Sequence, residues 1–465
     1  MRTGPSSAPT PLVPTSARTT RARGRHLLRA LGLTQTFVLA GLALRVAVGH
    51  ALGALGDLFV GLGRRAERRA ARRERDLARL ARALARLKGA FAKAGQFAAL
   101  RYDVLPPALR RSLAELEDRV PPLPLAEVRP VVEGELGRPL EALFERFDPQ
   151  PVGAASIAQV HRARLPGGDE VAVKVQYPWL AGSLGADLAL ARLLVRAWTR
   201  GRRGAVDRRR LFEEFAAGLR EELDFEREAR VAGEIAANLA GDPQIVVPRV
   251  YPALSGRRVL TLAYHRGIKV TDRDALARAG VDPADVLQVL ARAYAKQVFV
   301  DGLFHADPHP GNLFVLEEPD AARRPRVLFV DFGLSKRLDP ELREAMRKGL
   351  YALLRRDPEG FLAEMDRMGM IAPGAHAGVR RSLDAMFQRI AAEGAPLGLA
   401  GGQVLALKDE AKALLERTEG LQLPSELLLY AKTLSYLMAL GQELAPEVDV
   451  MRLCLPYALR FLAEG

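Results

Sequence analysis

Cysteine is almost absent from this chain of 465 residues, which contains Cys454 alone. A single thiol cannot close a disulfide within the chain, and it excludes a zinc site built from several cysteines. Disulfides persist mainly in oxidising compartments, so the composition favours a reducing one, and we expect a cytoplasmic protein. The rest of the composition, 49% hydrophobic and 27% charged, suits one two-lobed domain or two to three smaller domains.

A long apolar run is also missing. The segment 26–62 is mostly apolar, but its longest uncharged stretch, Ala30–Leu44, has 15 residues. A membrane-spanning helix needs roughly 18 such residues, so we expect an interfacial or core-packed helix here. The first 24 residues lack the apolar core of a secretory signal and are predicted to be disordered. Their arginine-rich composition also resembles an organelle transit peptide, although biased composition of the whole chain explains it more simply.

Acidic residues are scarce in residues 1–75, which hold 14 arginines, no lysine and three acids, and so carry +11 of the net charge of +14. Such a segment predicts contact with a polyanion, either an anionic membrane surface or nucleic acid. No aromatic or fold motif supports nucleic acid, which is not expected as a partner. Five arginines from Arg65 to Arg73 share one face of a helix expected over 64–99. That face is either solvated or a cationic stripe for an anionic membrane surface or lipid, which would make the protein peripheral to the membrane.

The remaining sequence changes from strand-like to helical patterns. Two short helices are expected within 125–147, and a hairpin follows with strands at 156–164 and 170–176. The later expected elements are helices over 180–240, strands at 246–250 and 259–263, a helix at 283–300, strands at 313–316 and 327–330, and helices from 340 to 462. A small β-rich lobe followed by a large helical lobe is the outline of a kinase.

An acidic loop carries the strongest chemical signal. Asp307 and Asn312 have the spacing D-x-x-x-x-N of a kinase catalytic loop, and Asp331 opens the sequence Asp-Phe-Gly directly after an apolar strand. Phosphoryl transfer needs an Asp near the acceptor, and an Asn and a second Asp that hold Mg²⁺ on the phosphates of ATP. Asp331 alone is also compatible with an ordinary turn at a strand end.

His305 and His309 are four residues apart and are open to a metal-ligand interpretation. Pro308 and Pro310 disfavour a helix there, so the two rings lose the shared face that this spacing would give. A structural role for His305 is the competing interpretation.

Lys174 lies on the second strand of the predicted hairpin, within the run Val-Ala-Val-Lys. Strand alternation places it opposite Val171 and Val173 and on the face of Ala172, which suits a lysine that reaches the α/β-phosphates. An ordinary surface lysine is the alternative. A buried ammonium needs a carboxylate partner, and the acidic residues 221–228 of the following helix are candidates.

The segment 153–159, Gly-Ala-Ala-Ser-Ile-Ala-Gln, stands where a protein kinase has its glycine-rich loop. It holds one glycine, so an alanine-rich turn of Ala154, Ala155 and Ser156 replaces the flexible phosphate-binding flap.

Together with these motifs, Lys93-Ala94-Gly95-Gln96 and Glu222-Leu223-Asp224 give the chain a clear likeness. It resembles the UbiB/AarF/ADCK family of atypical kinases, over the range from about residue 86 to the C-terminus. The six motifs in order, which make this likeness specific, are residues 93–96, 153–161, 171–178, 222–224, 305–312 and 331–333.

The resemblance implies a role for each motif residue. Lys93 is expected to pair with Glu222, so that Lys93, Gln96, Glu222 and Asp224 form a regulatory set in an N-terminal extension folded over the active site. Glu228 is expected to pair with Lys174. The resemblance further implies that members act in ubiquinone biosynthesis or other membrane-lipid processes, often as ATPases, and that quinone-biosynthesis proteins are partners.

We therefore predict an α+β, protein-kinase-like two-lobed fold with a helical N-terminal extension and a mostly helical C-terminal lobe. The expected segments are a disordered basic tail (1–25), an apolar segment (26–62), the extension (63–150), the N-lobe (151–265) and the C-lobe (266–465). The expected function is that of an ATP- and Mg²⁺-dependent kinase or ATPase, with a nucleotide-gated binding module for a lipid or protein partner as the alternative.

Overall fold

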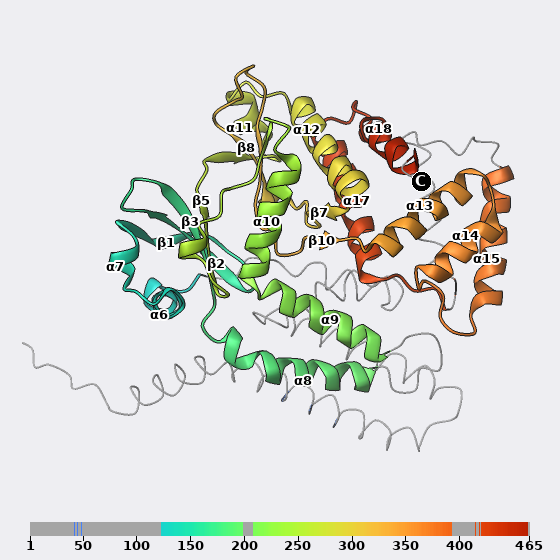
Figure 1. Cartoon of the computed structure of the whole chain (residues 1–465), viewed down its shortest axis with the longest axis horizontal. Coiled ribbons are helices and arrows are strands. Elements are labelled where there is room, and N and C mark those ends of the chain that lie inside the picture. The colour runs from blue at the N-terminus through green and yellow to red at the C-terminus, as the bar shows by residue number, and fades with distance from the viewer. Residues whose placement is uncertain are drawn as a thin grey trace, which may run out of the picture.

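The computed structural model describes residues 122–198, 208–392 and 420–463, with isolated positions at 41, 44, 48, 414 and 418. The basic tail, the apolar segment and most of the extension lie outside the described residues, as do Lys93 and Gln96. What was expected of them stays a prediction. The described ranges form a sheet-rich lobe and a larger helical lobe (Figure 1).

The N-terminal lobe is built on a four-stranded antiparallel sheet in the order β1-β2-β3-β5. Its strands are β1 (Arg146–Ala154), β2 (Ala158–Arg164), β3 (Glu170–Gln176) and β5 (Val259–Ala263). In β3, Val171 and Val173 are fully buried and pack with α6 (Leu125–Leu136) and α7 (Leu140–Leu143). Because side chains alternate along a strand, Lys174 lies on the opposite face, as the sequence predicts.

Three helices follow the sheet hairpin: α8 (Leu180–Trp198), α9 (Arg208–Glu222) and α10 (Phe225–Leu239). The α10 helix begins at a clear signal, because the Asp224 side chain accepts a hydrogen bond from the Arg227 amide and caps the helix. Figure 1 shows α10 between the first sheet and the helical lobe.

The C-terminal lobe has a second sheet, in the order β4-β9-β8-β6, and a small pair of strands, β7 and β10. These strands are β4 (Ile245–Val246), β6 (Gly267–Lys269), β7 (Leu303–Phe304), β8 (Leu313–Leu316), β9 (Val327–Phe329) and β10 (Lys336–Arg337). The short turn η1 (Pro252–Leu254) packs against β5 in the first lobe. The helices and short turns of the C-terminal lobe are α11 (Arg273–Arg278), α12 (Pro283–Ala295), η2 (Lys296–Asp301), η3 (Pro310–Asn312), α13 (Pro340–Leu354), α14 (Pro358–Arg367), α15 (His376–Ala392), α17 (Ser425–Leu444) and α18 (Val450–Ala463).

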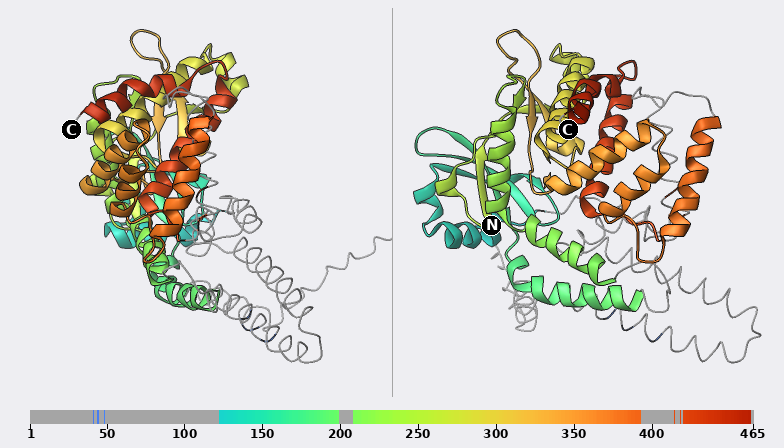
Figure 2. Two further views of the ribbon diagram at one scale, coloured as in Figure 1. Left: turned by 90° about the vertical axis from the view of Figure 1, so that its right-hand side faces the viewer. Right: turned by 45° about the vertical axis from the view of Figure 1, so that its right-hand side comes forward.

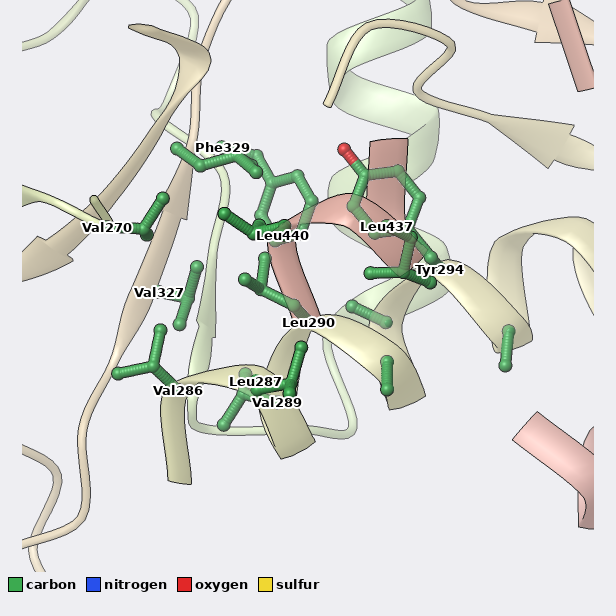
Figure 3. Close-up of a cluster of buried hydrophobic side chains, with 14 of the residues drawn as sticks. Val270, Val286, Leu287, Val289, Leu290, Tyr294, Val327, Phe329, Leu437 and Leu440 are labelled. Atoms are coloured by element: carbon green, nitrogen blue, oxygen red, sulfur yellow. The ribbon is translucent and has the colours of Figure 1, made fainter. Parts of the chain in front are cut away.

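The main core lies between α12, the β8–β9 hairpin and α17 (Figure 3). Leu287 and Leu290 from α12 meet Phe329 from β9 and Leu437 and Leu440 from α17. A separate apolar cluster joins α13, α14 and α15, which lie at the end of the lobe farthest from the first sheet (Figure 2). The loop between α12 and β8 and the end of β9 are thereby fixed on a packed core.

The two-lobed α+β prediction is confirmed, while the exact domain boundaries stay a prediction. The strand β1 at Arg146–Ala154 was not expected from the sequence, and the expected strand 246–250 is reduced to β4 and an isolated bridge at Val250. The helix expected to reach Val300 ends at Ala295 and continues as the π-helix η2. Within the described ranges, no helix combines the length and apolar character needed to cross a membrane.

Candidate active site

Lys174 joins three elements at one point. Its Nζ donates to the two carboxylate oxygens of Glu228 at 2.8 and 2.9 Å, and to Oδ1 of Asp331 at 2.7 Å. Lys174 comes from β3, Glu228 from the first turn of α10, and Asp331 from the loop after β9. The contact expected between Lys174 and Glu228 is present, and the N-lobe strand is tied to the C-lobe loop.

This cluster places one ammonium against two carboxylates. The Glu228 side chain is 2% exposed, whereas that of Asp331 is 44% exposed. Burial raises the pKa of Glu228 to about 7, since the opposing effect of Lys174 is weakened by the nearby Asp331. Burial disfavours the charge of Lys174, but the two carboxylates outweigh it and raise the pKa of the ammonium. The two carboxylates place an excess of negative charge around one ammonium, which a cation beside Asp331 would offset.

Asp307 is held on both carboxylate oxygens. Asn312 Nδ2 donates to Asp307 Oδ2 at 3.0 Å and to the Asp307 carbonyl oxygen at 3.2 Å. Lys432 Nζ from α17 lies 2.7 Å from Asp307 Oδ1. Because the amino group of Asn312 faces Asp307, the amide oxygen is the Asn312 atom suited to meet a cation.

His305 ties this loop to the end of β9. Its ring is fully buried, and its Nε2–H donates to the carbonyl oxygens of Val330 at 3.1 Å and Asp331 at 3.0 Å. The hydroxyl of Tyr294 donates to its Nδ1 at 3.1 Å. Burial lowers the pKa of His305, so the ring is neutral and both nitrogens are engaged. This arrangement favours the structural interpretation of His305, and it supports Asp331 in a left-handed backbone conformation, with φ of 63°.

Asp331 and Asn312 are chemically suited to Mg²⁺. Both offer oxygen ligands at adjoining strand ends, since the Val330 amide donates to the Asn312 carbonyl at 3.0 Å. Among the described residues no group of three His, Cys, Asp or Glu side chains could enclose a metal. Two ligands fit Mg²⁺, which commonly binds through one or two protein groups together with water and phosphate oxygens.

The alanine-rich turn between β1 and β2 is held by its own backbone. The Ala155 amide donates to the Ala158 carbonyl at 2.8 Å, and Tyr177 Oη donates to the Ala155 carbonyl at 2.9 Å. Ser156 is 1% exposed, and its hydroxyl has no hydrogen-bond partner among the described residues. Ala154 and Ala155 are half-buried beside it. The turn is thus a fixed element in place of a flexible flap.

Glu222 ends α9 close to the Lys174 cluster. A methyl group added at Gly333 would lie 3.6 Å from Glu228 Oε2 and 3.7 Å from Glu222 Cγ, so both acids adjoin this glycine. Asp224 is the cap of α10 rather than a member of the cluster. Lys93, the expected partner of Glu222, lies outside the described residues together with Gln96, so the regulatory role of this set stays a prediction.

Two features of the site were not anticipated from the sequence. One is Lys432, which comes from a helix more than a hundred residues beyond Asp307. The other is Arg227 of α10, which donates to the carbonyl oxygens of Gly333 at 3.4 Å and Ser335 at 3.0 Å. Lys432 is the single charged residue between Glu426 and Glu443, and an isolated charge in such an apolar stretch could have indicated a functional contact.

Comparison with known proteins places these motifs in a family. Residues 115–365 match the ABC1 atypical kinase-like domain. The chain is 33% identical to the chloroplastic protein ACTIVITY OF BC1 COMPLEX KINASE 8 of Arabidopsis thaliana over 401 residues, which cover 80% of this chain and 52% of the relative. It is 32% identical to the "Probable protein kinase UbiB" of Marinobacter nauticus, with 79% of this chain and 66% of the relative covered.

The chain thus spans about half to two thirds of the length of these curated relatives. Among solved structures, it is similar to Rv3197 of Mycobacterium tuberculosis in complex with erythromycin, with 26% identity and a TM-score of 0.50. That similarity covers 77% of this chain and 92% of the other. The kinase-like resemblance of the motifs is therefore confirmed, and the chain belongs to the ABC1 atypical kinase-like family.

Proposed function

We propose that the chain is an atypical kinase or ATPase that binds Mg·ATP between its two lobes. The observation that carries the proposal is the meeting of Lys174, Glu228 and Asp331. The pair Asp307–Asn312 on the adjoining loop supports it. Phosphoryl transfer depends on positioning and charge, and these five side chains supply a cation, metal-binding oxygens and an acceptor-facing carboxylate.

Each residue has a distinct part in this proposal. Lys174, oriented by Glu228, offsets the charge of the α/β-phosphates, and Asp331 and Asn312 hold Mg²⁺. Mg²⁺ supplies charge neutralisation at the phosphate oxygens when it is bound. Asp307 faces the acceptor and receives its proton.

The nucleotide is proposed to lie against the turn of Ala154, Ala155 and Ser156. The regulatory contacts of Glu222 with the extension, through Lys93, belong to the same proposal.

A role in isoprenoid-quinone or membrane-lipid metabolism is the broader part of the proposal. It is supported by the relatives named UbiB and by the resemblance of the motifs, and it would bring quinone-biosynthesis proteins as partners. Metabolite profiling of a deletion strain, directed at quinones and polar lipids, tests it. A strain with unchanged quinones and polar lipids would remove this part and leave the ATP chemistry standing.

A nucleotide-gated binding module is the second candidate. The backbone of Ala155 is committed to Ala158 and Tyr177, so the turn offers fewer free amides to phosphates than a glycine-rich flap. In that case ATP would bind and control a lipid or protein partner without sustained turnover. Phosphate release from ATP separates the two candidates.

Removing the proposed metal ligand Asp331 tests the ATP site. In a thermal-shift titration, Asp331→Asn should weaken Mg·ATP affinity by about 10-fold or more, because even the loss of a group that only supports a metal ligand commonly costs that much. Asp274→Asn, at an exposed position on α11, is the matched control and should bind as the wild type does. An unchanged ATP-induced shift in Asp331→Asn would reject the metal assignment, and its absence in the wild type would reject the proposed function.

A further inference from the structure

A lysine from the C-terminal helix α17 reaches the loop that carries Asp307. Lys432 Nζ lies 2.7 Å from Asp307 Oδ1, and the two side chains are only 16% and 25% exposed. The other carboxylate oxygen, Oδ2, accepts from Asn312. One oxygen of Asp307 is therefore held by a charge and the other by an amide, which restricts the rotation of the carboxylate.

The position of Lys432 is fixed by the packing of its helix. Three residues earlier, Leu429 packs against Phe304 at the entry to the Asp307 loop. Five residues later, Leu437 is buried in the main core. Thr433 is also buried and donates to the Leu429 carbonyl. The lysine is thus presented by a packed element, which positions a side chain more tightly than an exposed loop does.

The Asp307 loop supplies no lysine or arginine of its own. Positions 308–311 are Pro, His, Pro and Gly, and His309 Nδ1 accepts a hydrogen bond from the Gly311 amide. A carboxylate that faces the acceptor lies close to the triphosphate, and like charges repel at such range. The ammonium of Lys432 at Oδ1 offsets part of this repulsion and, together with Asn312 at Oδ2, holds the Asp307 carboxylate in one orientation.

We propose that Lys432 is a positioning residue for phosphoryl transfer, which acts by fixing the carboxylate of Asp307. The inference rests on the function proposed above. It predicts an effect on turnover and little effect on nucleotide binding, because Lys174, Asn312 and Asp331 are the groups assigned to the nucleotide and its metal.

Steady-state phosphate release from Mg·ATP tests the inference in the full chain. Lys432→Gln and Lys432→Met remove the charge and should lower kcat by about 10-fold or more, because misplacement of a reacting group costs at least that much. The KM for ATP should stay within about 2-fold of the wild type, as expected when ground-state binding is unchanged. Lys432→Arg should retain most of kcat. Lys348→Gln, on α13 and 48% exposed, is the matched control and should behave as the wild type.

Several results would overturn the inference. These are a wild-type kcat in Lys432→Gln, a raised KM at unchanged kcat, or an equal loss of kcat in Lys432→Arg and Lys432→Gln. If neither neutral variant folds in a thermal-unfolding experiment, the charge is required for folding and the positioning role is rejected. A wild type that releases no phosphate rejects the proposed function itself, which separates that failure from the failure of the Lys432 inference.

Discussion

Glu228 is a carboxylic acid whose protonation changes near neutral pH. Burial raises its pKa from 4.5 to about 7, so the folded protein holds this proton more tightly than the unfolded chain does. The contribution of Glu228 to the free energy of unfolding is therefore fully present below about pH 4.5 and is lost as the pH rises through about 7. This direction is opposite to that of most carboxylates in ion pairs, because the burial of Glu228 outweighs the attraction of Lys174, and the nearby Asp331 adds to the effect of burial.

Replacing Glu228 with glutamine should remove this dependence on pH. Glutamine is neutral throughout, so in Mg²⁺-free urea unfolding, Glu228→Gln should gain stability relative to the wild type between about pH 5 and pH 8. Glu226→Gln, exposed on the same helix, should follow the wild type at every pH. A relative loss of stability in Glu228→Gln with rising pH would mean that the ion pair with Lys174 outweighs the cost of burial.

At this scale the sequence identifies residues that belong to motifs and misses those that do not. Asp307, Asn312 and Asp331 have fixed spacings beside predicted strands, so their meeting was predictable. Lys432 has no such spacing, because its contact with Asp307 depends on how a distant helix packs. Arg227 was missed because its hydrogen-bond acceptors are the backbone carbonyls of Gly333 and Ser335, which no side-chain pattern in the sequence indicates.

The helix α10 is hydrogen-bonded to the segment that follows Asp331. Arg227 donates to the carbonyl oxygens of Gly333 and Ser335. At the end of α9, Glu221 accepts from Lys336 at 2.6 Å. The helix that carries Glu228 and the loop that carries Asp331 are therefore joined at more places than the Lys174 cluster.

Loss of Arg227 should loosen this connection. Arg227→Ala is expected to lower the free energy of unfolding by about 2 kcal/mol, the usual size for hydrogen bonds from a charged group. It should also weaken Mg·ATP affinity, because the backbone after Asp331 loses its support. Urea unfolding and a thermal-shift titration measure the two effects. Arg230→Ala, exposed on the same helix, serves as control, and equal behaviour of the two variants would contradict the expected role.

The elements that the sequence predicts well are those with several residues of clear periodicity. β3, β5 and β8 agree with the expected ranges, because alternation or an apolar run is bounded by turn residues. β1 contains Pro149 and Pro151 and is an edge strand with irregular register. Because proline disfavours a strand assignment, the sequence of this segment gives no sign that it forms a strand. β6, β7 and β10 have two or three residues each, too few for any period to show.

For the whole molecule, the two-lobed order was predictable because a strand-rich region precedes a helical one. The mutual placement of the lobes was not, since it depends on contacts between residues far apart in sequence, such as Lys174 and Asp331. What is expected of the N-terminal segment rests on its sequence alone, because that segment lies outside the described residues.

That segment is expected to be the membrane contact. Each basic residue near an anionic surface contributes about 1 kcal/mol, so five arginines between Arg65 and Arg73 beside an apolar segment could hold the protein peripherally. In liposome flotation the full chain should float with anionic vesicles and less so in high salt, as charges are screened. A chain starting at Leu77 should stay at the bottom.

Neutral vesicles and a full chain with the five arginines changed to glutamine are the controls, and both should reduce flotation. If the shortened chain floats as well as the full one, the membrane contact lies in the lobes, and the arginines form an ordinary solvated helix face.

The contact of α17 with Asp307 shows that the last sequence motif and a helix that contacts the site lie at different places along the chain. The last motif ends at Gly333, and a fragment that stopped before Ser425 would still contain every residue by which the chain is recognised. It would lack Lys432, and it would expose the faces of α12 that Leu437 and Leu440 cover. A fragment chosen by its motifs is therefore shorter than the unit that packs around α12, and it would measure neither the stability of that core nor the effect of Lys432.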